Sequence, residues 1–161
     1  MSGFGFHSGA GSVRIDEAGT RHIEVNAIGS ATVGEVIEIH AEMRDSGRLQ
    51  FPCYRVNARF DGGMSGGPVF SDRGRVCGIV CSSLPPSQEG EEHVSYVATL
   101  WPAMAIPVHV DPSGAEIDQP YPLLRLAQMN IISAAGFENV AMGETLAPGL
   151  WKISYTYQHA N

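Results

Sequence analysis

The side chains most suited to catalysis lie in one short run of the sequence. A single serine, Ser65, stands among glycines, and the run then continues into an apolar segment. Glycine lets a backbone turn sharply, so we expect this serine at a corner of the chain with its hydroxyl facing an open cleft. A serine hydroxyl is a nucleophile only beside a base, and no upstream histidine stands in a recognisable base motif. The run reads Phe60-Asp61-Gly62-Gly63-Met64-Ser65-Gly66-Gly67-Pro68-Val69.

We expect strands, rather than helices, to hold this serine in place. A chain of 161 residues with 43% hydrophobic and 17% charged residues can bury a real core. Nineteen glycines and ten prolines stand against a single lysine, Lys152, which favours short strands joined by tight turns over a helical bundle. The composition therefore predicts a mainly β protein.

Charge and hydropathy limit the partners. The formal net charge is -7 and the arginines are scattered, so we expect no nucleic-acid partner. The longest apolar region, residues 97–110, is broken by Pro102 and Pro107 and is too short to span a bilayer, so we expect no membrane insertion. The first residues lack the pattern of a secretory signal. We expect a soluble, cytoplasmic protein.

The three cysteines fit no paired framework. Cys77 and Cys81 in one extended strand would be about 13 Å apart, too far for a disulfide, and Cys53 stands alone. Reduced thiols are the expectation for a cytoplasmic protein. No Cys-x-x-Cys or His-x-x-x-His pair, phosphate loop or dinucleotide fingerprint occurs, so we expect neither a metal nor a cofactor.

The pattern along the chain predicts successive strand pairs and one helix. Alternating apolar and polar residues with turn signals between them indicate the strands, and Pro85 to Glu92 has the composition of a surface loop. A helical apolar spacing with a proline in the first turn and Gly136 at the end predicts a helix. The predicted strands are 12–16 with 22–28, 33–41 with 49–60, 68–71 with 75–83, and 94–100, and the helix is 122–135.

The motif around Ser65 resembles that of a known family. Gly63-Met64-Ser65-Gly66-Gly67-Pro68 matches the Gly-x-Ser-Gly-Gly-Pro motif of trypsin- and chymotrypsin-like serine peptidases, and a hairpin leading to Val76-Cys77-Gly78-Ile79-Val80 follows it, as in the C-terminal barrel of that family. Ser2-Gly3-Phe4-Gly5 is similar to the strand that opens this barrel. The resemblance implies a six-stranded antiparallel Greek-key barrel of the trypsin-like type over residues 1–110, with a C-terminal helix and one or two additional strands in residues 111–161.

The resemblance also implies roles for individual residues. Ser65 would be the nucleophile of a serine endopeptidase, and the backbone N–H groups of Gly63 and Ser65 would stabilise the oxyanion of the substrate carbonyl. Cys81, Ser82 and Ser83 would line the primary specificity pocket and pair with the backbone of a polypeptide substrate.

Two departures from the family stand out. Met64 replaces the aspartate that normally precedes the serine, which removes the buried ion pair used in zymogen activation. The base histidine and orienting aspartate of the family belong to an N-terminal barrel that these residues do not include. Because loss of the base lowers serine-peptidase turnover by about 10⁶-fold, we expect this chain alone to be inactive.

The histidines offer no clear substitute for that base. His22 and His40 alternate with apolar neighbours in predicted strands, and we expect both, like His93 in a polar stretch, to be solvated. His7 is the candidate nearest the face that the missing barrel would cover, but no aspartate is placed to orient it.

Two other functions fit parts of the same pattern. A peptidase fold without a base could be a binding module for extended peptides, and the coding sequence upstream of Met1 would distinguish this from a peptidase with a missing barrel. Gly63-Met64-Ser65-Gly66-Gly67 also satisfies the nucleophile elbow of α/β-hydrolases, with Asp111, Asp118, His109 and His159 downstream. That elbow must run into a helix, whereas residues 68–74 read as strand and turn.

One half of a two-barrel enzyme exposes the apolar face that would pack against the other barrel. We therefore expect self-association through that face, or coverage of it by residues 136–161, with Phe137, Trp151, Tyr155 and Tyr157. The simpler alternative is that residues 150–157 form one more strand with its aromatic residues packed on one side.

Overall fold

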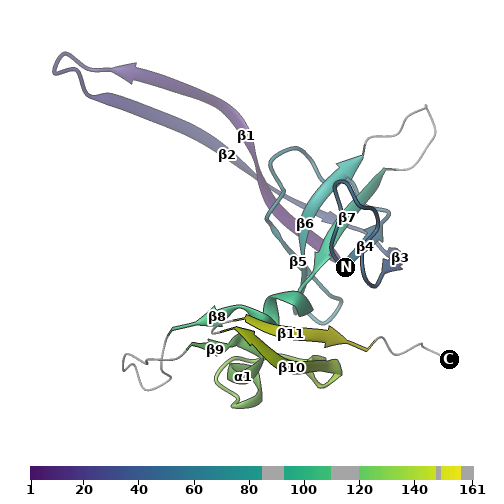
Figure 1. The fold of residues 1–161 in the computed structure, drawn as a ribbon. Coiled ribbons are helices and arrows are strands. Elements are labelled where there is room, and N and C mark those ends of the chain that lie inside the picture. Colours follow the sequence, from purple (N-terminus) through teal and green to yellow (C-terminus); the bar gives the residue numbers. More distant parts are fainter. Residues whose placement is uncertain (85–92, 110–119, 148–149, 157–161) are drawn as a thin grey trace. The chain divides into compact units, whose positions relative to one another are not determined.

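The structure is a computed structural model that describes residues 1–84, 93–109, 120–147 and 150–156, without the side chains of residues 7–10, 25 and 144–146. Contacts divide the chain into two compact units, Met1–Thr99 and Leu100–Asn161 (Figure 1). The predicted boundary at residue 110 and the predicted loop at residues 85–92 lie outside the described residues.

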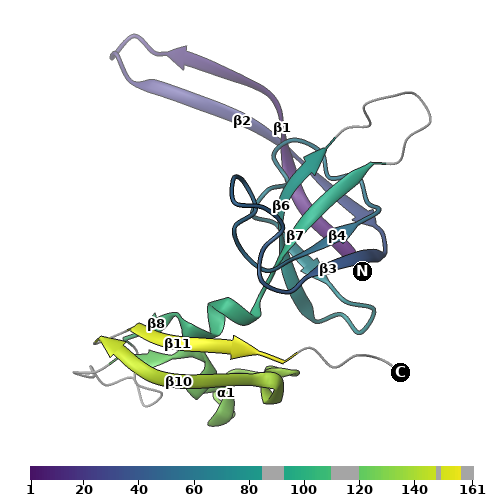
Figure 2. The same ribbon diagram turned by 45° about the vertical axis from the view of Figure 1, so that its right-hand side comes forward.

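The first unit is built on one antiparallel sheet of seven strands in the order β2-β1-β5-β6-β7-β4-β3 (Figure 2). The predicted mainly β, antiparallel architecture with a single α-helix is confirmed over the described residues. The strands are β1 (Ser2–Ile15), β2 (Arg21–Val33), β3 (Val36–His40), β4 (Cys53–Val56), β5 (Pro68–Phe70), β6 (Val76–Leu84) and β7 (Val94–Thr99).

A six-stranded closed barrel is not confirmed. Among the described residues no ladder joins β2 to β3, which stand at the two edges of the sheet. These edge strands are nevertheless consecutive in the chain, with only Gly34 and Glu35 between them.

Strands β1 and β2 form a hairpin much longer than the sequence pattern predicted. Its turn is fixed by Asp16, whose carboxylate accepts the N–H groups of Ala18 and Thr20 at 3.0 and 2.9 Å and contacts His22 Nε2 at 2.8 Å. The hydrogen bonds from His22 and Thr20 hold the pKa of Asp16 below its usual value. Strand β1 pairs with β5 only at Ser2 and Gly3, so the rest of the hairpin extends beyond the sheet (Figure 1).

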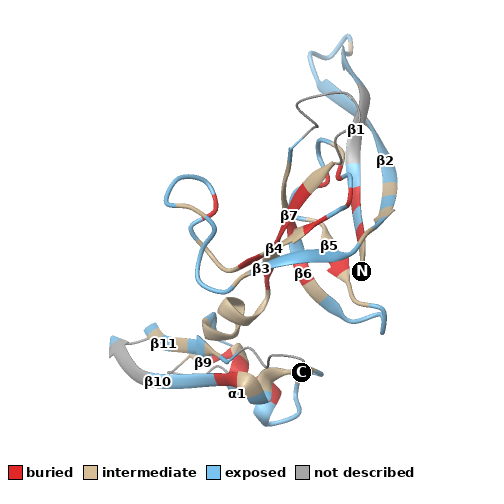
Figure 3. Cartoon of the chain, turned by 90° about the vertical axis from the view of Figure 1, so that its right-hand side faces the viewer, coloured by how far each residue is buried: buried red, intermediate tan, exposed pale blue. Residues whose placement is uncertain are grey.

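The core of the first unit lies between the inner faces of β4 to β7 and the loop before β5, where the buried residues gather (Figure 3). Strand β6 shows how the period of two builds it, since Val80 is 2% exposed while its neighbour Ile79 is 39% exposed. The buried members are Val56, Ala58, Phe60, Met64, Val69, Val80 and Val97.

His40 is less exposed than the sequence pattern predicted. Its side chain is 16% exposed, Nε2 is buried without a hydrogen bond, and the ring lies 6.2 Å from that of Tyr96. Arg44 lies over the same tyrosine ring at 4.7 Å, so the segment after β3 folds back over the face that the alternation assigned to solvent. The expectation of a solvated His40 is therefore wrong, whereas His22 is half-exposed as expected.

The second unit has short elements and a shorter helix than predicted. Helix α1 ends at Gln128 because Asn130 takes a positive φ of 59°, and Gly136 instead precedes a short 3-10 helix. No helix in the described part of the chain is long and apolar enough to cross a bilayer. The elements are η1 (Trp101–Ala105), β8 (Pro107–Val108), β9 (Tyr121–Pro122), α1 (Leu123–Gln128), η2 (Phe137–Asn139), β10 (Val140–Ala147) and β11 (Leu150–Tyr155).

Strand β11 confirms the simpler interpretation of the C-terminal aromatic residues. Its burial alternates, with Trp151, Ile153 and Tyr155 half-buried on one side, and Tyr155 stacks on Trp101 at 5.9 Å. Tyr157 lies outside the described residues.

Strand β1 approaches the loop before β5 at Gly67. A Cβ at this position would lie 2.1 Å from the carbonyl oxygen of Phe4 and 2.9 Å from that of Met64. Only glycine therefore allows the two segments to pack at this distance.

We expect Gly67→Ala to lower the free energy of unfolding of the first unit by about 1–3 kcal/mol, because a methyl group must displace backbone on both sides. Urea denaturation followed through the NMR signals of β5 and β6 amides measures this. Gly62→Ala is the matched control, since a Cβ at Gly62 meets nothing within 4 Å. Equal stability of the two variants would show that β1 does not press on Gly67.

Candidate active site

Two successive turns carry the chain from Asp61 to Gly67. In the first, the Met64 N–H donates to the Asp61 carbonyl at 3.1 Å, and Gly63 has a φ of 98°. In the second, the Gly67 N–H donates to the Met64 carbonyl at 2.9 Å, and Gly66 has a φ of 87°. A positive φ at the third position is the signature of a type II turn, which explains why glycine stands at both places.

The turns leave two particular amides without a partner. The N–H groups of Met64, Gly66 and Gly67 all donate to backbone carbonyls, whereas those of Gly63 and Ser65 donate to no group among the described residues. Both residues are exposed. Adjacent free backbone donors of this kind can bind an anionic oxygen, which is the role that the resemblance implies for these two amides.

Ser65 stands at the exposed corner between the turns. Its Oγ lies 3.4 Å from the Cys81 carbonyl oxygen, a long and weak hydrogen bond that leaves the hydroxyl available. The chain continues into strand β5 at Pro68 rather than into a helix. The corner and the accessible hydroxyl match the sequence expectation, and the catalytic role of Ser65 stays a prediction.

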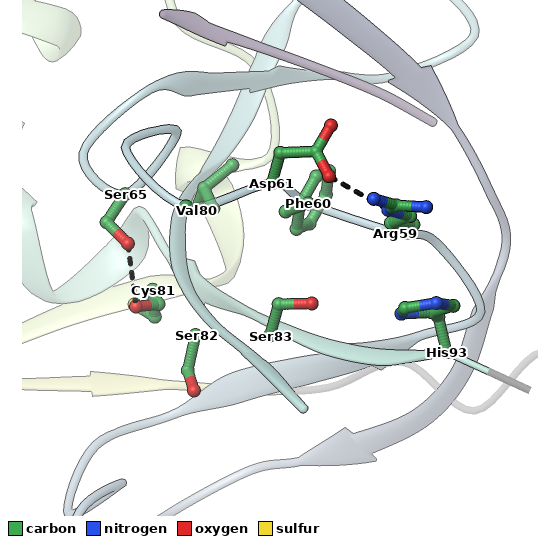
Figure 4. Close-up of a pocket in the computed structure, with 10 residues that line it drawn as sticks. Arg59, Phe60, Asp61, Ser65, Val80, Cys81, Ser82, Ser83 and His93 are labelled. Atoms are coloured by element: carbon green, nitrogen blue, oxygen red, sulfur yellow. Dashed lines mark hydrogen bonds and ion pairs between the residues drawn. The ribbon is translucent and has the colours of Figure 1, made fainter. Parts of the chain in front are cut away.

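A cavity of about 470 Å³ lies beside Ser65 (Figure 4). The predicted Ser65, Cys81, Ser82 and Ser83 all line it, and the lining on the loop side includes Gly62 rather than Gly63. The other lining residues are Arg59, Phe60, Asp61, Val80 and His93.

Strand β6 has a free edge on the side of this cavity. Up to Val80 the edge is occupied, since the Val80 carbonyl accepts from Gly66 at 2.8 Å and the Val80 N–H donates to Gly67 at 2.9 Å. From Cys81 onward, the ladder partners of β6 within the described residues are all in β7. An extended peptide could therefore pair with this edge and continue past Ser65.

The Cys81 thiol is a poor competitor for the role of nucleophile. It contacts the Ile79 carbonyl oxygen at 3.6 Å, and burial raises its pKa above the ordinary value. The thiol therefore stays protonated at neutral pH, where only the thiolate is reactive. Burial likewise raises the pKa of Cys53 and Cys77, and all three cysteines are free, as the sequence indicated.

Three polar residues of the cavity were missed by sequence reasoning. Arg59 Nε donates to Asp61 Oδ1 at 2.8 Å, so their charges offset each other at the rim. His93 was expected to be solvated, but its Nδ1 is buried and has no hydrogen-bond partner among the described residues. The available signal was its place two residues before Ser95, which puts both on the same face of an extended strand.

No described histidine of the first unit forms a hydrogen bond with Ser65. His93 lies at the end of the cavity opposite Ser65 (Figure 4), and His22 is paired with Asp16 at the turn of the β1–β2 hairpin. The side chain of His7 lies outside the described part of the structure. Within the described residues no three side chains of His, Cys, Asp or Glu gather to hold a metal ion.

Comparison with known protein families, with curated proteins and with solved structures finds no match for this chain.

The turns are fixed from below by Met64, whose side chain is fully buried and whose Sδ lies 3.3 Å from the Asp61 N–H. We expect Met64→Asp to lower the free energy of unfolding by more than about 4 kcal/mol, because it buries a carboxylate without a cation. Met64→Leu, which keeps the volume and the apolar surface, should cost less than about 1.5 kcal/mol. Urea denaturation of both variants provides the comparison, and a well-folded Met64→Asp protein would contradict the apolar anchoring of the loop.

Proposed function

We propose that this chain carries the nucleophile-bearing half of a trypsin-like serine endopeptidase. The observation that carries the proposal is the pair of unpartnered amides at Gly63 and Ser65, next to an accessible hydroxyl and a free strand edge. An acyl-transfer site needs a nucleophile, donors for the oxyanion and a means of holding the peptide in line, and these three are adjacent here.

The strand order supports the finer proposal of a six-stranded barrel. If β2 and β3 are counted as one strand that bends at Gly34 and Glu35, this strand lies next to β1 at one end of the strand order and next to β4 at the other. The order then closes into a ring of six strands. Backbone hydrogen bonds at the bend join both neighbours, from Gly34 to the Met1 carbonyl at 3.0 Å and from Asn57 to the Glu35 carbonyl at 3.1 Å. The glycine permits the sharp bend that such a corner needs.

In the proposed reaction, Ser65 Oγ attacks the carbonyl carbon of a peptide bond while a base takes its proton. The amides of Gly63 and Ser65 stabilise the oxyanion, and the base then protonates the departing amine to leave an acyl-enzyme that water hydrolyses. The base would come from a second barrel, within a longer protein or in a partner. This chain supplies the nucleophile, the oxyanion donors and the peptide-binding edge.

A module that binds extended peptides without cleaving them is the second candidate, and the free edge of β6 favours it equally. The α/β-hydrolase alternative has less support, because a strand follows Ser65 and every described strand pair is antiparallel. Its downstream candidates Asp111, Asp118 and His159 lie outside the described residues, and His109 is exposed.

Amide chemical shifts test the proposed oxyanion site. A short peptide with a free C-terminal carboxylate imitates a cleavage product, and we expect it to move the Gly63 and Ser65 amide protons downfield. The amides of Met64 and Gly66 are already hydrogen-bonded and serve as internal controls. The same peptide with an amidated C-terminus should bind at least about tenfold more weakly, because hydrogen bonds to a charged group are the stronger ones. Absence of any shift at Gly63 and Ser65 would reject the site.

The isolated chain should be unreactive as a hydrolase. A serine-directed fluorophosphonate is expected to label it no faster than it labels the Ser65→Ala variant, because no described group takes the hydroxyl proton. Gel-based labelling over time measures the rate. Rapid labelling that depends on Ser65 would mean that a base exists within the chain.

We also propose that the first unit uses exposed apolar surface to bind the missing barrel or a second copy. Val13 and Ile23 face each other across the hairpin and are 61% and 66% exposed. Patches of this kind usually mark an interface.

We expect Ile23→Lys to reduce self-association and the binding of dyes specific for apolar surface. Ser12→Lys adds the same charge on the other face of the hairpin and should change neither. Light scattering at several concentrations provides the measurement, and a monomer in all three proteins would contradict the proposal.

A further inference from the structure

Resting on the proposed function, we infer that the cavity beside Ser65 binds an uncharged carboxamide side chain, that of glutamine or asparagine. This side chain belongs to the residue whose carbonyl Ser65 attacks. The inference depends on the hydrogen-bonding groups that the cavity presents and on its charge.

The first of these groups is the Ser83 hydroxyl, which faces the cavity as an acceptor. Ser95 is fully buried, and its Oγ lies 2.6 Å from the Ala58 carbonyl oxygen and 3.0 Å from Ser83 Oγ. A carbonyl cannot donate, so the single hydroxyl proton of Ser95 goes to Ala58. The Ser83 hydroxyl must then donate its own proton to Ser95, which leaves only lone pairs directed at a ligand.

The second group is His93, which supplies a donor. Its Nδ1 is buried without a hydrogen-bond partner in the described part of the chain, and a buried polar atom of this kind is costly unless a ligand satisfies it. Ser83 pairs with Ser95 in the β6–β7 ladder, and His93 precedes Ser95 by two residues, so the three lie on one face. Figure 4 shows the Ser83 hydroxyl and the His93 ring directed toward each other, away from Ser65.

The charges of the cavity offset each other. Arg59 and Asp61 form an ion pair at 2.8 Å, and among the described residues no other one that lines the cavity has a permanent charge. A carboxylate in the cavity would face the lone pairs of Ser83 and the carboxylate of Asp61. An ammonium group would face the Arg59 guanidinium and would leave the His93 donor unused.

A carboxamide satisfies both groups at once. Its oxygen accepts from the Nδ1–H of His93, and its NH₂ group donates to Ser83 Oγ. Phe60 and Val80, which are 4% and 2% exposed, provide apolar walls for the methylene groups of the stem. Two methylene groups make glutamine the better fit of the two amides.

Titration of the 161-residue chain with product-like peptides tests this inference. The peptides share one sequence and a free C-terminal carboxylate, and end in Gln, Asn, Glu, Lys or Ala. We expect the Gln peptide to bind at least about tenfold more tightly than the Ala and Glu peptides, because it gains two hydrogen bonds. On binding, the ¹⁵N signal of His93 Nδ1 should be that of a protonated ring nitrogen in a neutral imidazole.

Two variants assign the preference to these residues. His93→Ala should reduce the affinity for the Gln peptide to that for the Ala peptide. Ser83→Ala should remove part of the preference, and His109→Ala, an exposed histidine of the second unit, should remove none. If His93→Ala does not fold, the Ser83→Ala variant and the peptide series on the native chain still decide the question.

The outcomes separate the inference from the proposed function. Equal binding of all peptides, or tightest binding of the Glu or Lys peptide, overturns the carboxamide inference while shifts at Gly63 and Ser65 preserve the peptidase site. No binding and no shift at those amides overturns both.

Discussion

The burial of the Met64 side chain is the interaction on which the candidate site depends. Its side chain is held in the core while its N–H and carbonyl are each used by one of the two turns. Because the side chain, the N–H and the carbonyl of Met64 are all held in place, the backbone on either side of it is constrained. The amides of Gly63 and Ser65 therefore remain on the exposed side. The hydrophobic free energy of one buried side chain, about 1.5–3 kcal/mol, therefore positions the donors before any ligand arrives.

An apolar anchor also changes how such a site could be controlled. A buried aspartate at this position would require a cation, and the supply of that cation could switch the loop between two states. Met64 packs against residues that are part of the folded core, so the loop forms when the unit folds. Under the proposed function, control of the chemistry would then lie with the base, which no described residue provides, rather than with the oxyanion donors.

The sequence pattern correctly predicted the turns and strands that depend mainly on neighbouring residues. Glycine at Gly63 and Gly66 indicated the turns, and alternation gave β6, β7 and the face of β11. The expectation for His40 failed for a tertiary reason, because the segment after β3 folds back over Tyr96 and covers the histidine. The predicted helix end failed for a local reason, since the helix ends at Gln128 rather than at residue 135, where Asn130 takes a positive φ. The place of His93 was missed because the spacing to Ser95 puts both on one face, but only the pairing of Ser95 with Ser83 across β6 and β7 shows that this face borders the cavity.

The charges inside the cavity and the net charge of the whole chain would affect ligand binding in different ways. A net charge of -7 acts on peptides only over about a Debye length, near 8 Å at physiological salt, and it disfavours acidic ligands in general. Inside the cavity Arg59 and Asp61 are paired with each other, so hydrogen bonding rather than charge would discriminate between ligands. A site built around buried donors and acceptors rejects ligands that leave them unpaired more strongly than an apolar pocket rejects a change of size. In the proposed site, the buried Nδ1 of His93, which has no hydrogen-bond partner among the described residues, would therefore make the cavity selective rather than merely open.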